Sequence, residues 1–166
     1  MIRVTMSTVP SRLPVLWAKI IIFVVVALPA LVISCVLAFT FGTHVLSSGG
    51  AVSATWSDPT AVRAVFGSAV NLVGIGVMGI ALGFLTRSIA GGLAILIGGV
   101  RVLSSLLPVL LPESWSAVLK YMPSNAGQAF ASGTRMPGTL EPFPGALVYF
   151  GWVILSVILA VFFLKK

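Results

Sequence analysis

Long apolar runs separated by short polar segments form the dominant pattern of the chain. Four of these runs contain about 20 residues, the length that an α-helix needs to cross a bilayer core about 30 Å thick. Backbone N–H and C=O groups find no partners in lipid, so each run is expected to be α-helical, and none shows the alternation of a membrane β-barrel. The predicted spans are, to within a few residues, 20–41, 64–85, 89–111 and 146–164.

The connections between the predicted spans differ in length. The sequence LTRS is short enough to make the second and third spans a tight helical hairpin. The connection over residues 42–63 is polar and rich in glycine, and it contains SDP, a sequence typical of a helix start. The connection over residues 112–145 is the longest. Its sequence ESWSAVLKYM predicts a short helix at the membrane surface, with Trp115 and Tyr121 as aromatic anchors.

Charged residues predict how the spans are oriented. If there are four spans, one side of the membrane holds Arg3, Arg12, Lys19, Arg87, Lys165 and Lys166. The other side holds all three acids, Asp58, Glu113 and Glu141, with Arg63, Lys120 and Arg135. Because basic residues mark the cytoplasmic side, both chain ends are expected in the cytoplasm. The sequence thus predicts one all-α, multi-pass domain over residues 1–166 in the plasma membrane, with residues 42–63 and 112–145 outside.

Composition supports a membrane domain and argues against several classes of function. Hydrophobic residues make up 58% of the chain and charged residues 8%, whereas soluble domains carry about 25% charged residues. The net charge is +7, but the basic residues lie at the ends of apolar runs and not in one patch, so no nucleic-acid partner is expected. One cysteine and one histidine exclude a disulfide framework and a Cys/His metal cluster within the chain. No phosphate loop or nucleophile elbow occurs, and we predict neither enzymatic activity nor a cofactor.

The sequence GIGVMG, residues 74–79, matches the glycine pattern of dinucleotide-binding folds. That function requires a preceding strand and an acid about 20 residues further on, whereas this match lies in an apolar run and no acid follows before Glu113. Helix packing is the better interpretation, because Gly79 and Gly83 have the G-x-x-x-G spacing that lets two helices approach closely in lipid. Asn71, in the same run, is expected either to hydrogen-bond to a neighbouring helix or to face a cavity.

Arg101 falls near the middle of the third predicted span. A charge there costs about 2.5–3.5 kcal/mol on insertion scales, and the predicted spans contain no acid. Three explanations stay open: Arg101 lines a translocation path, it pairs with a carbonyl or with another chain, or the span boundary is misplaced. Ser104, Ser105 and Pro108 indicate a locally opened helix.

A basic segment with two prolines, MIRVTMSTVPSRLPVLWAK, precedes the first span. Ile2, Met6 and Val9 recur at helical spacing on one face. Pro10 ends that helix, and Pro14 suits the first turn of the next one. We therefore predict a short amphipathic cytoplasmic helix joined to the first span by a stiff basic elbow. Such a segment fits a membrane protein that is pushed by a soluble partner.

Three stretches together resemble the permeases of type-2 ATP-binding-cassette exporters. IRVTMSTVPSRLPVLWAK is similar to the cytoplasmic loop that meets the ATPase in that family, with Pro10, Arg12 and Lys19 in matching places. LKYMPSNAGQAF resembles the stretch before the last span of actinobacterial members, and WSDPTAVRAVFGSAV resembles the entry to their fourth span. The resemblance covers almost the whole chain as spans three to six. The family carries about two further spans, and the Glu/Gly start of the loop, before this point.

The resemblance implies the C-terminal part of an exporter permease, which pairs with a second permease copy and with separate ATPase subunits. The candidates for coupling to the ATPase are Ile2, Arg3, Met6, Pro10 and Arg12, with Arg3 and Arg12 expected to meet acidic groups of the ATPase or lipid phosphates. Two other hypotheses stay open. One is a non-transporting membrane subunit or remnant that assembles through glycine-rich helix faces. The other, weaker for lack of an acid or base in the spans, is an enzyme that acts on a lipid through Asn71 and Arg101.

Overall fold

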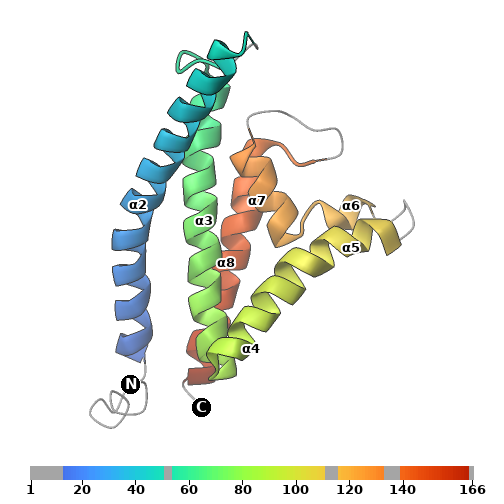
Figure 1. The fold of residues 1–166 in the computed structure, drawn as a ribbon. Coiled ribbons are helices and arrows are strands. Elements are labelled where there is room, and N and C mark those ends of the chain that lie inside the picture. Colours follow the sequence, from blue (N-terminus) through green and yellow to red (C-terminus); the bar gives the residue numbers. More distant parts are fainter. Residues whose placement is uncertain (1–12, 51–53, 111–115, 133–138, 165–166) are drawn as a thin grey trace.

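Three long helices form the bundle around which the rest of the chain is arranged. The computed structural model describes residues 13–50, 54–110, 116–132 and 139–164, which are helices and the turns between them, without a strand. The long helices are α2 (Leu13–Ser48), α3 (Pro59–Thr86) and α8 (Pro142–Leu164). Within the described ranges, these three are long and apolar enough to cross a membrane. Helix α3 lies between α2 and α8, and the start of α2 and the end of α8 lie at the same end of the bundle (Figure 1).

Helix α2 contains 36 residues and extends beyond the predicted span, residues 20–41, at both ends. The polar residues in its second half do not end it. Thr40 and Thr43 donate their hydroxyl protons to carbonyls three or four residues earlier, and so bond within the helix itself. The chain turns away only at Gly50, whose φ of +75° is a left-handed conformation that glycine adopts without steric conflict.

The ends of the second and last long helices follow the sequence signals closely. Helix α3 begins at Pro59 with Asp58 as its N-cap, so the helix start predicted from SDP is confirmed. At its other end, Arg87 adopts a left-handed conformation with φ of 52°, and Ser88 caps the next helix by accepting a hydrogen bond from the Gly91 amide at 3.3 Å. This tight turn confirms the helical hairpin. Helix α8 starts with a proline, four residues before its predicted start.

The third predicted span, residues 89–111, is a succession of three helical segments. These are α4 (Ile89–Ala94), the π-helix η1 (Ile95–Val102) and α5 (Leu103–Leu110). We call residues 89–110 the arm. It leaves the lower end of α3 and diverges from α8 along its length (Figure 1). Only three single helices reach spanning length in the described part of the chain, so a fourth span stays a prediction.

The segment predicted as an outer loop, residues 112–145, contains two helices, α6 (Ser116–Leu119) and α7 (Pro123–Ala131). The surface helix predicted from ESWSAVLKYM corresponds to the four residues of α6, and Trp115 lies outside the described residues. Helix α7 was not predicted. It packs against α3 and α8, because its alanines and a glycine let it approach closely: a Cβ at Gly67 of α3 would lie 3.2 Å from the backbone of Ala131.

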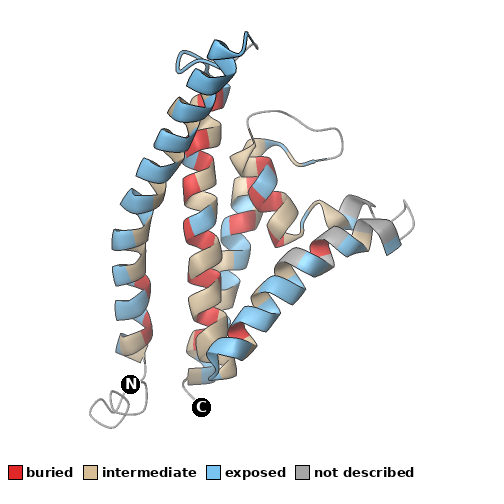
Figure 2. Ribbon diagram, in the orientation of Figure 1, coloured by how far each residue is buried: buried red, intermediate tan, exposed pale blue. Residues whose placement is uncertain are grey.

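Buried residues follow α3 along its length, and one cluster of buried residues lies toward the end of the bundle at which α2 starts. It consists of Leu16, Ile20, Val73, Val77, Ala81 and Ala160. Leu16 and Ile20 are the buried residues of α2, and most of its remaining surface is exposed and apolar (Figure 2). Such a surface is suited to contact with lipid. The predicted amphipathic helix, with Ile2, Arg3, Met6, Pro10 and Arg12, lies outside the residues that the structure describes.

Candidate functional site

The glycines of GIGVMG lie on the central helix α3 and face different neighbours. A Cβ at Gly74 would overlap the ring of Tyr149 on α8, and a Cβ at Gly76 would overlap the ring of Phe23 on α2. The motif lies within one continuous helix, where backbone N–H groups bond to earlier carbonyls and are not free to hold a phosphate. These glycines therefore make room for aromatic side chains.

Gly79 faces the arm, and Gly83 contacts it through backbone atoms. A Cβ at Gly92 of α4 would lie 2.7 Å from both the Cα and the N of Gly83, so the two backbones are in contact at this point. A Cβ at Gly79 would lie 3.3 Å from the Cδ2 atom of Leu96. This is the close approach that glycine permits between helices, and it fixes the base of the arm on α3.

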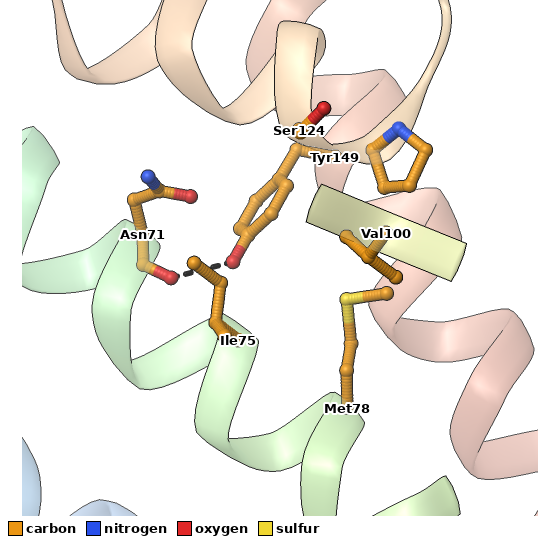
Figure 3. A pocket seen from close by; sticks show the side chains of 7 residues that line it. Asn71, Ile75, Met78, Val100, Ser124 and Tyr149 are labelled. Atoms are coloured by element: carbon orange, nitrogen blue, oxygen red, sulfur yellow. Dashed lines mark hydrogen bonds between the residues drawn. The ribbon is translucent and has the colours of Figure 1, made fainter. Parts of the chain in front are cut away.

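A small cavity lies where α3, η1, α7 and α8 meet (Figure 3). The space between its walls is about 250 Å³ including its open side, with room for about one water molecule at its centre. Its walls combine an amide, a phenol and a hydroxyl with apolar side chains. The lining residues are Asn71, Ile75, Met78, Val100, Pro123, Ser124 and Tyr149.

Tyr149 holds the helices together at this cavity. Its side chain is 1% exposed, and its hydroxyl donates a hydrogen bond to the backbone carbonyl of Asn71 at 2.6 Å (Figure 3). The ring fits because the positions beside it on α3 and α7 are glycines: a Cβ at Gly127 would lie 3.1 Å from the ring, and a Cβ at Gly74 would overlap it. Tyr149 thus contacts α3 and α7 from α8.

The sequence-predicted polar residues lie at or next to this cavity. Asn71 lines it, and its side-chain Oδ1 lies against Gly127 of α7. The hydrogen bond that Tyr149 of α8 donates is accepted by the backbone carbonyl of Asn71 and not by its side-chain amide. Arg101 lies in η1, immediately after the lining residue Val100.

The turn between α6 and α7 is fixed halfway along α8 (Figure 1). The indole N–H of Trp152 donates a hydrogen bond to the carbonyl of Tyr121 at 2.9 Å, and the side-chain amide of Asn125 donates one to the carbonyl of Leu119 at 2.8 Å. Tyr121, predicted as an anchor at the membrane surface, therefore has its backbone held against α8, while its side chain is exposed. A polar indole in the middle of an apolar run was the sequence signal that could have revealed this, since an indole N–H in apolar surroundings usually finds a hydrogen-bond acceptor.

Replacing Trp152 by phenylalanine should loosen this turn. The variant keeps an aromatic ring but loses the donor, and a lost hydrogen bond of this kind costs about 1 kcal/mol. We expect faster backbone hydrogen exchange over residues 119–126 in detergent. The matched control is Trp56→Phe. Trp56 packs on Phe39 in the second half of α2, so this substitution should leave exchange in the turn between α6 and α7 unchanged. Equal exchange of the turn in both variants would contradict the anchoring role of Trp152.

The described residues include no group of three or more His, Cys, Asp or Glu side chains that could hold a metal ion. Three polar side chains, those of Asn71, Ser124 and Tyr149, are among the residues that line the cavity. The Tyr149 hydroxyl is already bonded to the Asn71 carbonyl, and the Ser124 hydroxyl is buried without a hydrogen-bond partner in the described part of the chain. Comparison with known proteins finds no match to this chain among protein-family profiles, curated proteins or solved structures.

Proposed function

We propose that this chain is the membrane-spanning part, corresponding to the C-terminal spans, of an exporter permease driven by a separate ATP-binding-cassette ATPase. In this proposal it lies in the plasma membrane with both chain ends in the cytoplasm and pairs with a second permease copy. One observation carries the proposal. The basic N-terminal segment leads directly into the end of α2 that packs in the buried cluster, where Leu16 is fully buried.

A push on the N-terminal segment would therefore act on a buried cluster that joins the three long helices. Leu16 and Ile20 of α2 belong to the same core cluster as Val77 of α3 and Ala160 of α8. Lys19 adds a contact between α2 and α3, since its ammonium lies 5.4 Å from the centre of the Phe84 ring. Because packed interiors transmit displacement, movement of α2 at this end would also move α3 and α8.

The same helices border the cavity, so this movement would also displace the walls of the cavity. Asn71 on α3 and Tyr149 on α8 form two of its walls, and Val100 of the arm forms a third. A shift of α3 relative to the arm changes the shape of the space between them. Such a change, driven by ATP in the partner, is the step that an exporter requires.

The alternative, a subunit that only assembles with other helices through glycine faces, could use glycines at which an added Cβ would meet no described atom within 4 Å, but not the glycines that already pack within the chain. The glycines with this open space include Gly83, Gly98 and Gly151. Gly74, Gly76 and Gly79 are occupied by contacts with helices of the same chain, and Gly92 packs on α3. These positions are therefore already used within the described bundle and are not available for a foreign helix.

Purification of the native protein through a C-terminal tag, in mild detergent, tests the proposed function. We expect mass spectrometry to identify a retained ATP-binding-cassette subunit and the complex to hydrolyse ATP. A double variant, Arg3→Glu with Arg12→Glu, should retain at least about tenfold less of this ATPase, because it reverses charges that are expected to face acidic groups.

Arg87→Glu is the matched control, since it reverses a charge in the hairpin turn at the same end of the bundle (Figure 1). It should retain the ATPase at the wild-type level. If the wild-type chain is purified intact without an ATPase, the exporter proposal fails and a non-transporting subunit becomes the better hypothesis. Equal loss in both variants would overturn the coupling role of Arg3 and Arg12.

A further inference from the structure

Lys120 lies in the turn that is fixed halfway along α8. The next residue, Tyr121, accepts the hydrogen bond from Trp152. Trp152 is eleven residues after Glu141 and thirteen before Lys165, so it lies about 16 Å along the helix from the outer acid. If α8 crosses a hydrocarbon core about 30 Å thick, Lys120 lies near the middle of the bilayer.

Helix α3 gives the same depth independently. The cavity at the start of α7 is lined by Ile75 of α3 and by Pro123, the first residue of α7. Along α3, the flanking charged residues are Arg63 and Arg87, and Ile75 is twelve residues from each. Two helices therefore assign the turn before α7 to the centre of the apolar layer.

Lys120 brings a positive charge to this depth. In the sequence of η1, Arg101 follows the cavity residue Val100. The acids within the described ranges, Asp58 and Glu141, lie at the starts of α3 and α8, far from this depth. The nearby N-terminal end of α7 also carries a partial positive charge, which makes the turn less favourable for a cation and more favourable for an anion.

An ammonium group at this depth requires a partner. An isolated charge at the bilayer centre costs about 2.5–3.5 kcal/mol on insertion scales. The lysine stem is too short to carry its charge to a membrane surface about 15 Å away. Lys120 is half-buried, so the protein does not enclose it completely and a group from the bilayer can reach it. Ionisable residues within membranes commonly mark ligand sites for this reason.

We propose that Lys120 binds the anionic group, a carboxylate or a phosphate, of an amphiphile that enters from the bilayer. The ammonium donates charge-assisted hydrogen bonds to the anionic oxygens, and the start of α7 adds a favourable potential. The apolar tail stays in lipid beside the exposed side chains near the turn, such as Trp152 and Leu155. This site does not depend on the ATPase, and it would stand even if the proposed export function failed.

Trp152 provides a reporter at the site, because its indole bonds to the residue after Lys120. The other three tryptophans, Trp17, Trp56 and Trp115, are replaced by phenylalanine in the full chain, which is then reconstituted in phosphatidylcholine vesicles. Fluorescence of Trp152 is measured against added dibromostearate at mildly alkaline pH, where this fatty acid is ionised, because bromine quenches tryptophan only at short range. The methyl ester of the same acid is the neutral control, and brominated phosphatidylglycerol tests a phosphate in place of the carboxylate.

We expect the ionised acid to quench Trp152 at a concentration about tenfold lower than its methyl ester. Lys120→Gln should remove this difference, whereas Lys120→Arg should keep it. Lys19→Gln, which removes a lysine near the start of α2, should leave it unchanged.

If the acid and its ester quench Trp152 equally in the protein that keeps Lys120, the proposal is overturned. It is also overturned if the Lys120→Gln variant binds the acid as tightly as the protein that keeps Lys120. The acid-against-ester comparison decides the question even if Lys120→Gln does not fold. Displacement of the probe by inorganic phosphate or acetate would assign the site to a soluble anion and overturn the amphiphile. Binding without any retained ATPase would support the site while the exporter proposal failed.

Discussion

Replacing Tyr149 by alanine is expected to destabilise the bundle by about 3–5 kcal/mol, the range measured for truncation of large buried aromatic residues. The ring is 1% exposed and fills the junction of α3, α7 and α8. Its neighbours there are Gly74 and Gly127, which have no side chains that could fill the space left behind. The variant also loses the hydrogen bond to the Asn71 carbonyl.

The free energy of unfolding can be measured in mixed micelles with increasing sodium dodecyl sulfate, followed by circular dichroism. Tyr149→Phe is the matched control, because it keeps the ring and removes only the hydroxyl that bonds at 2.6 Å. It should cost about 1 kcal/mol. If Tyr149→Ala unfolds at the same detergent fraction as Tyr149→Phe, packing of the ring does not hold the three helices together.

Gly92→Ala is expected to destabilise the protein by about 1–3 kcal/mol through steric conflict. The added methyl group would lie 2.7 Å from backbone atoms of Gly83, which cannot move aside as the end of a flexible side chain can. The base of the arm would have to move away from α3. This loss must exceed the gain of about 1 kcal/mol that alanine normally brings over glycine within a helix.

Gly83→Ala separates the steric effect from helix propensity. The two glycines are in contact, but a Cβ at Gly83 would meet no atom of the described residues within 4 Å. Unfolding in the same micelles should show no loss of stability, or a small gain. Similar losses in both variants would mean that this close contact does not determine the stability of the hairpin.

Apolar length in the sequence was enough to predict the three long helices, because a helix in lipid needs only a continuous run without charge, and the short LTRS connection predicted the turn after α3. Apolar length also predicted a span over 89–111, where the structure has three shorter helical segments. Helix α7 could not be predicted in this way. Its sequence PSNAGQAFA is polar enough to resemble a loop, and it is placed by contacts with α3 and α8 that lie far away in the chain. The π-helix η1 is equally invisible to hydropathy, since it changes the hydrogen-bond pattern of the backbone and not its apolar length.

The candidate site was predictable only in part, for a related reason. Because an amide is rare in an apolar run, the sequence made Asn71 a candidate site residue, and Asn71 does line the cavity. Tyr149 and Trp152 are as common in predicted spans as any aromatic residue, and their roles depend on where the O–H and N–H groups find acceptors. Those acceptors are backbone carbonyls on other segments, which no local pattern identifies.

The π-helical segment η1 sets the rotational phase of everything that follows it in the arm. A π-turn accommodates one residue more than an α-turn, so conversion of η1 to an α-helix would rotate α5 about its own axis by roughly 100°, the angle of one helical residue. Ser104, now 4% exposed, has a buried hydroxyl without a hydrogen-bond partner in the described part of the chain. The same rotation would turn this hydroxyl to a different face, so the winding of eight residues determines which side of α5 meets α6.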